Sequence, residues 1–217
     1  HTPVTPASEP VQTELAFWLD GQLNAGRKFD GEAVVWTDLA RGSNVDLELD
    51  DNCNWGADDK GLKIKATGTS SEAGTYVALP EVVTNAIKSG KFTTEIVVSG
   101  FSFENPSSKV STPLLRANND KFSDYIRSDD ALCSKGSTLV KTEVATLLGT
   151  TTQHTITHTF DGTKNVFYVD GAKVKESSAY KDYAASDWLR LAGNSTNATY
   201  HGVRVYDRAL TADEVKA

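Results

Sequence analysis

Alternating apolar and polar positions predict many short β-strands along this chain. The clearest is Phe92–Phe101, where Phe92 and Ile96 fall on one face and Glu95 and Ser99 on the other. Successive side chains of a strand point to opposite sides, so one face of this segment should cover a core. Further strands are expected over residues 14–19, 33–36, 45–49, 62–66, 75–79, 113–117, 124–127 and 138–145.

Turn residues separate these strands at regular intervals, most clearly in the last quarter of the chain. One half-apolar run ends at Asp161-Gly162, and the next ends at Asp170-Gly171 and then reverses. Type I′ hairpin turns need positive φ at both central residues, which Asp-Gly tolerates. The second pair therefore predicts a tight β-hairpin.

Helical signals are few. Pro80–Ser89 predicts a short helix, with Val83 and Ile87 on one face and Gly90 as its stop. Another short helix is expected from Thr211. Many strands with few helices indicate an all-β sandwich or barrel.

The order of several motifs resembles one known group of domains. They are Leu15-Ala-Phe-Trp-Leu-Asp20, Val35-Trp-Thr-Asp38, Phe92-Thr-Thr-Glu-Ile96, Phe160-Asp-Gly162, Tyr168-Val-Asp-Gly171 and Gly202-Val-Arg-Val-Tyr-Asp-Arg-Ala-Leu210. This order is similar to the concanavalin A-like lectin/glucanase superfamily, in its laminin-G-like jelly-roll domains from secreted bacterial proteins. The resemblance implies a two-sheet antiparallel β-sandwich with one or two short helices over residues 13–217.

Composition narrows the possible partners and setting. Residues 1–12 are rich in Thr and Pro, which predicts an extended linker and a module of a larger protein. The net charge of −7 argues against nucleic acid and anionic membrane surfaces. No apolar run approaches the roughly 20 residues of a membrane span. We expect a monomeric module in an extracellular or cell-surface protein.

The two cysteines, Cys53 and Cys133, allow two interpretations. They are either two separate thiols or one disulfide, which the secreted appearance of the chain would permit. Neither has a Cys-x-x-Cys partner or a nearby histidine, so a zinc site is not expected.

The resemblance implies a function in glycan binding, because most members of the group bind glycans. We predict a non-catalytic carbohydrate-binding module of a glycan-processing enzyme or an adhesin. Two alternatives remain: a protein-binding or structural adhesin module of the same fold, and a glycanase.

Evidence for catalysis in the sequence is weak. Glycanases of this fold resemble one another in Glu-x-Asp-x-x-Glu on a strand, and only Glu48 and Asp50 come near that pattern. They are interpreted as a solvated acidic turn. His154 and His158 lie roughly 13 Å apart along a strand, too far for one ion.

The richest cluster for sugar recognition lies in the middle of the chain. Arg116 and Asn118 would share one strand face, and Tyr125 and Arg127 would share a face of the next strand. Planar polar groups satisfy sugar hydroxyls, so these four side chains could form a binding site if the strands pair. The same pattern fits a surface network of salt bridges.

Aromatic residues add two candidates. Trp55 lies in a polar loop, where it either caps the core or offers an exposed stacking platform. Trp188 and Arg190 should face outward if Leu189 and Leu191 face the core. Trp18 is interpreted as a core residue of a strand.

Structural calcium is common in the group, so the resemblance implies a possible calcium site. By motif position its candidate ligands are Asp20, Asp38 and Asp207. Aspartates that cap turns would give the same pattern.

Overall fold

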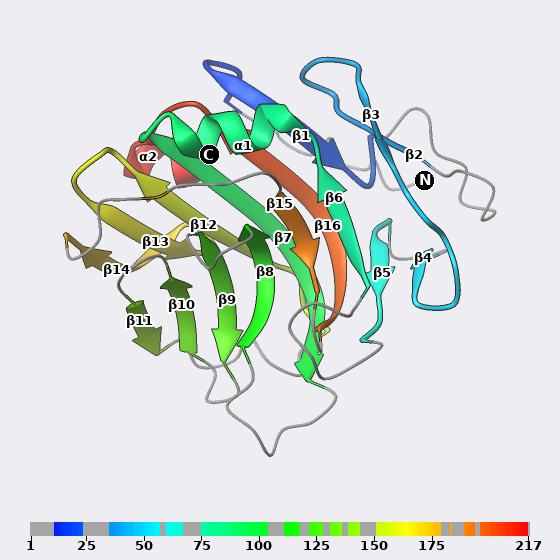
Figure 1. The fold of residues 1–217 in the computed structure, drawn as a ribbon. Coiled ribbons are helices and arrows are strands. Elements are labelled where there is room, and N and C mark those ends of the chain that lie inside the picture. The colour runs from blue at the N-terminus through cyan, green and yellow to red at the C-terminus, as the bar shows by residue number, and fades with distance from the viewer. Residues whose placement is uncertain are drawn as a thin grey trace, which may run out of the picture.

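The chain forms two antiparallel sheets that face each other across a shared core (Figure 1). The computed structural model describes residues 11–23, 35–56, 60–66, 75–103, 111–117, 122–127, 131–135, 139–143, 151–178, 183, 189–193 and 196–216. The predicted all-β sandwich is confirmed. The linker predicted over residues 1–12 falls almost wholly outside these ranges.

The larger sheet has eight strands among the described residues. Their order is β14-β13-β12-β7-β16-β5-β4, and β1 also pairs with β16. The bounds are β1 Leu15–Asp20, β4 Cys53–Trp55, β5 Leu62–Ile64, β7 Phe92–Phe103, β12 His154–Phe160, β13 Asn165–Val169, β14 Ala172–Ser177 and β16 Thr196–Tyr206. β16 is central, because it pairs with β7 along one side and with β5 and β1 along the other.

The smaller sheet has six strands in the described part of the chain, in the order β11-β10-β9-β8-β15-β6. The bounds are β6 Tyr76–Leu79, β8 Ser111–Ala117, β9 Ser123–Arg127, β10 Ala131–Lys135, β11 Leu139–Glu143 and β15 Leu189–Ala192. A separate hairpin joins β2 (Val35–Thr37) to β3 (Asn44–Asp46).

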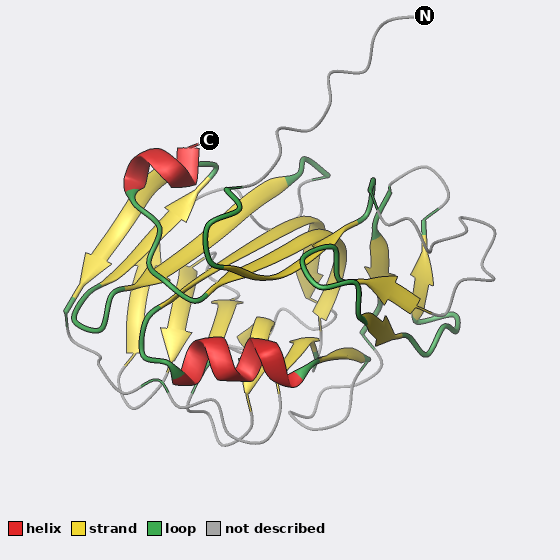
Figure 2. Ribbon diagram, turned by 90° about the horizontal axis from the view of Figure 1, so that it is seen from above, coloured by secondary structure: helices red, strands yellow, loops and turns green. Residues whose placement is uncertain are grey.

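Helix α1 (Glu81–Lys88) links β6 of the smaller sheet to β7 of the larger one. Pro80 precedes it and Gly90 follows it with φ of 80°, as the sequence predicts. It buries Val83 and Ile87 in the core. The last helix, α2 (Ala212–Lys216), lies on a different side of the molecule (Figure 2).

Polar side chains bridge the two sheets inside the core. His158 of β12 places Nδ1 2.9 Å from Oδ2 of Asp124 on β9, and its Nε2 lies 2.9 Å from Oδ1 of Asn165. Tyr200 of β16 donates its hydroxyl to the carbonyl oxygen of Leu114 on β8, at 3.0 Å. Buried polar groups are costly when unpaired, so these bonds favour one alignment of the sheets.

Local predictions succeed where a turn residue fixes the backbone. Asp170 and Gly171 have φ of 50° and 75°, as a type I′ turn requires between β13 and β14.

Two strands of the structure were not predicted from the sequence. β4 follows the polar run Asp51-Asn52, which is typical of a loop, and β10 contains no β-branched residue.

Candidate functional site

The outer face of the eight-stranded sheet, turned away from the core, is lined by polar side chains. Glu95 of β7 lies between Arg204 of β16 and Thr157 of β12 in the strand register. Ser99 and His201 extend this row along the same two strands. We call this surface the polar face.

The described residues of the polar face line three hollows. The central hollow, of about 220 Å³, is lined by Trp18, Asp20, Lys60, Gln153, His201 and Arg204. The C-terminal hollow, of about 350 Å³, is lined by Glu95, Thr155, Asp170, Arg204, Tyr206 and Glu214. The edge hollow, of about 270 Å³, lies beside β4 and β5. Arg204 borders the first two hollows and so separates them.

Close backbone packing builds one wall of the central hollow. Gly21 donates its N–H to the carbonyl oxygen of His201 at 2.8 Å. A Cβ on Gly21 would lie 1.9 Å from the carbonyl oxygen of Lys60, so only glycine fits. The neighbouring Asp20 caps this turn by accepting the N–H groups of Gln22 and Leu23. Three separate segments are thereby fixed together.

His201 reaches the polar face because β16 is bulged between Tyr200 and Gly202. Its Nε2 lies 2.7 Å from Oγ of Ser99, and its Nδ1 lies 3.3 Å from Nε2 of Gln153. The imidazole is therefore held on both sides beside the central hollow.

Arg204 and Glu95 form an ion pair with unequal burial. Nε of Arg204 lies 3.1 Å from Oε2 of Glu95, and the side chains are 26% and 7% exposed. Thr157 donates its hydroxyl to Oε1 of Glu95 over 3.4 Å. Burial raises the pKa of Glu95 above its ordinary value, although Arg204 and Thr157 oppose that shift.

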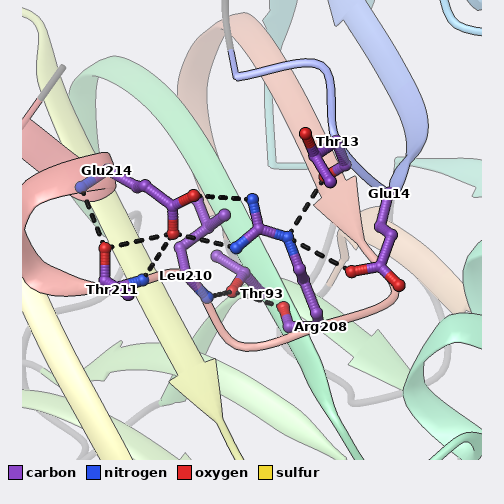
Figure 3. A network of polar contacts seen from close by, with 7 residues as sticks. All are labelled: Thr13, Glu14, Thr93, Arg208, Leu210, Thr211 and Glu214. Atoms are coloured by element: carbon purple, nitrogen blue, oxygen red, sulfur yellow. Dashed lines mark hydrogen bonds and ion pairs between the residues drawn. The ribbon is translucent and has the colours of Figure 1, made fainter.

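A second arginine four residues later forms a denser network (Figure 3). Arg208 donates Nη1 and Nη2 to the two carboxylate oxygens of Glu214, each at 2.8 Å. Its Nε donates to the carbonyl oxygen of Thr13 and lies 3.3 Å from the Glu14 carboxylate. The pKa of Glu214 falls to about 2, mainly because of the Arg208 hydrogen bonds. This network fastens α2 to the sheet.

A family model described as the concanavalin A-like lectin/glucanases superfamily matches residues 70–216. The chain belongs to this superfamily. No curated protein is significantly similar to the chain in sequence.

Solved structures with the same fold include enzymes and toxin binding domains. The sialidase of Trypanosoma rangeli with sialic acid matches 99% of this chain and 34% of its own, with a TM-score of 0.65 and 19% identity. The binding domain of Paraclostridial Mosquitocidal Protein 1 matches 94% of this chain and 51% of its own chain. Its TM-score is 0.66 and its sequence identity is 16%.

The receptor binding domain of botulinum neurotoxin type G matches 94% of the chain and 50% of its own, with a TM-score of 0.65 and 13% identity. The chain of this protein thus spans about a third of the sialidase and about half of each of the two binding-domain structures. At such low identity the likeness concerns the fold.

The predicted cluster of Arg116 and Tyr125 lies on the other sheet. Strands β8 and β9 do pair, and the register places these two side chains on the same outer face. Tyr125 is only 6% exposed and packs with Cys133, which leaves little of its ring for a ligand. Asn118 and the side chain of Arg127 lie outside the described residues. The role of this cluster in binding stays a prediction.

Trp188 also lies outside the described residues, but its neighbours follow the prediction. Leu189 and Leu191 are buried, and Arg190 faces outward with its guanidinium carbon 3.6 Å from the ring centre of Tyr76. This cation–π contact lies on the outer face of the smaller sheet.

Trp55 follows one of its two interpretations, whereas Trp18 differs from its own. Trp55 is 7% exposed and packs edge-to-face on Trp36, with ring centres 5.2 Å apart. It therefore caps the core, and the exposed platform is wrong. Trp18, interpreted as core, is half-buried and lines the central hollow.

Two of the three predicted calcium ligands accept hydrogen bonds from nearby backbone groups. Asp38 is fully buried, and its carboxylate accepts hydrogen bonds from the N–H groups of Trp18 and Ala40. Asp20 caps its own turn, and Asp207 is exposed. The described part of the chain holds no group of three or more acidic, histidine or cysteine residues suited to a metal. Calcium binding by Asp20, Asp38 and Asp207 stays a prediction.

The weak catalytic pattern is also explained by a turn. Asp50 accepts the N–H groups of Asn52 and Cys53, and Glu48 is exposed. His154 pairs with Asp170 at 2.8 Å. The two cysteines are separate buried thiols. The acidic-turn interpretation and the two-thiol alternative are both confirmed.

The sequence did not indicate that Arg204 and Glu95 are neighbours. Both charged residues stand at alternate positions of strands within recognised motifs, so their outward direction was readable. Their pairing was not, because it depends on β7 and β16 being adjacent although more than 100 positions separate the two residues.

Proposed function

We propose that this domain is a non-catalytic carbohydrate-binding module of a secreted or cell-surface protein that processes or adheres to glycans. The observation that carries the proposal is the central hollow, where an aromatic ring, a guanidinium, a carboxylate and an amide meet. Sugars require such a mixture, since they carry hydroxyl groups beside apolar C–H surfaces. The similar binding domains of the mosquitocidal protein and of botulinum neurotoxin type G support a binding role.

The same proposal includes the kind of protein to which this domain belongs. The chain corresponds to part of each larger structure that it matches, which supports a module within a longer protein. No helix in the described ranges is long and apolar enough to cross a membrane. We expect the module to act as a monomer that brings its parent protein to a glycan surface.

A glycan array tests the proposal directly. Labelled domain should bind at least one oligosaccharide or polysaccharide reproducibly, and unlabelled glycan should compete in solution. Absence of binding to every glycan, together with capture of a protein ligand, would favour the protein-binding alternative.

A glycanase is the second candidate, and Glu95 is the observation that favours it. This buried carboxyl group has a raised pKa and faces a hollow that Asp170 and Glu214 also line. General acids in glycoside hydrolysis share such a raised pKa. Release of reducing ends from a bound polysaccharide, lost in Glu95→Gln, would establish this activity.

A further inference from the structure

We propose that the central hollow binds one pyranose unit of a neutral glycan, with Arg204 as its main hydrogen-bond donor. This inference rests on the proposed carbohydrate-binding function and adds to it a site and a class of sugar.

Arg204 is fixed in place yet retains donors for a ligand. Its Nε faces Glu95, whereas its two terminal nitrogens form no hydrogen bond with any other described residue. A guanidinium offers two parallel N–H groups, a geometry that suits two adjacent oxygens such as neighbouring hydroxyls. Because Glu95 already orders the side chain, a ligand would lose less of its binding energy to ordering it.

The other walls of the central hollow complement this donor. Oδ1 of Asp20 is engaged by its turn, and Oδ2 remains as an acceptor. The exposed amide of Gln153 can donate and accept, and the half-buried indole of Trp18 adds an aromatic surface. Donors and acceptors are thus mixed around one hollow, as a ring with several hydroxyls requires.

The charges around the central hollow favour a neutral ligand. Lys60 and Arg204 contribute two positive charges, which Asp20 and the partner Glu95 offset. The whole chain carries a net charge of −7, so an acidic sugar would gain little attraction here.

Arg204 also borders the C-terminal hollow, but the three carboxylates described there are already engaged. The carboxylate of Glu95 faces Arg204, that of Asp170 faces His154 and the N–H of Thr155, and that of Glu214 faces Arg208. A ligand there would have to replace existing bonds. The central hollow is therefore the better site.

The test compares two matched variants by nuclear magnetic resonance titration of the whole chain. The probes are methyl glycosides of glucose, galactose and mannose, with glucuronic acid and N-acetylneuraminic acid as acidic counterparts. Arg204→Lys keeps the charge beside Glu95 but loses the planar fork, so it should weaken binding of a neutral glycoside about tenfold. Arg208→Lys should bind as the wild type does.

The titration of the wild-type protein alone also locates the binding site. The amide signals of residues 19–23 and 199–204 should shift with a neutral glycoside, and those of residues 113–117 should not. Shifts confined to residues 113–117 and 123–127, or binding of acidic sugars alone, would overturn this inference and leave the carbohydrate-binding function standing. If neither these probes nor any glycan of the array binds, both proposals fail.

Discussion

The two arginine–glutamate pairs at the end of β16 lie only four residues apart and differ in how fully their groups are engaged. Arg208 uses all three guanidinium nitrogens on Thr13, Glu14 and Glu214. Among the described residues, Arg204 has a partner for Nε alone, which is Glu95. The first arrangement joins segments of the fold, whereas the second keeps donors for something outside it. Saturation of hydrogen-bonding groups is therefore a guide to which charged pair is structural.

A threonine lies beside each of the two pairs, and its replacement should affect the stability of the protein very differently at the two places. The buried hydroxyl of Thr93 donates to the carbonyl of Arg208 and accepts the N–H of Leu210, both at 2.8 Å. Thr93→Val keeps the shape but leaves both groups unpaired, so the free energy of unfolding should fall by about 3 kcal/mol. Chemical denaturation measures it.

Thr157→Val is the matched control at the other pair. Its single bond to Glu95 is 3.4 Å long, so the loss should stay below about 1 kcal/mol. Equal losses in both variants would contradict the distinction drawn between the pairs.

The arginines themselves should give a smaller difference. Arg208→Lys loses the paired bonds to Glu214 and the bond to Thr13, which should lower the free energy of unfolding by about 1–2 kcal/mol. Arg204→Lys should lose less than about 0.5 kcal/mol, because an ammonium can still face Glu95. Thermal unfolding of both variants beside the wild type measures this, and a larger loss in Arg204→Lys would reverse the comparison.

The loss of stability at acidic pH should depend in part on Glu214. Its pKa is about 2 in the folded state, so between pH 4.5 and 2 the unfolded chain binds more protons. Its stabilising effect should be complete above pH 5 and disappear as the pH falls through that window. Since the group is partly solvated, we expect about 1 kcal/mol. In Glu214→Gln this part of the pH dependence should be missing.

Glu95 should make stability depend on pH in the opposite direction. We expect this effect to be the smallest of those predicted here. Its pKa is raised in the folded state, so the folded chain binds the proton more tightly. Stability should therefore decrease as the pH rises above 4.5 through the folded pKa, and Glu95→Gln should flatten that slope. Unfolding measured from pH 4 to pH 8 decides it; a slope that is steeper in the variant would refute the assignment.

Features fixed by local chemistry were predictable from sequence. Pro80 and Gly90 set the limits of α1, and Asp170-Gly171 sets the turn between β13 and β14. The alternation in β7 correctly separated Ile96, which faces the core, from Glu95. In each case the signal lies within a few residues of the structure that it determines.

The site was harder to predict because it depends on irregular strands and distant pairings. A register shift between Leu15 and Phe17 accompanies the outward direction of Trp18, and a bulge beside Gly202 turns His201 outward. The first lies in a uniformly apolar run and leaves no signal, and the second appears only as a change of phase between Tyr200 and Val203. Trp55 misled for a related reason: its polar neighbours indicated a loop, but it lies on an edge strand that covers the core.

The central place of β16 has a consequence for the order in which the protein can assemble during synthesis. β16 begins at Thr196, so it is synthesised after every other described strand of both sheets. Until it arrives, β1, β4 and β5 have no connection to β7, β12, β13 and β14 within the larger sheet. We therefore expect a nascent chain ending at Gly193 to remain open to proteases, and one that includes residue 216 to become resistant in a single step.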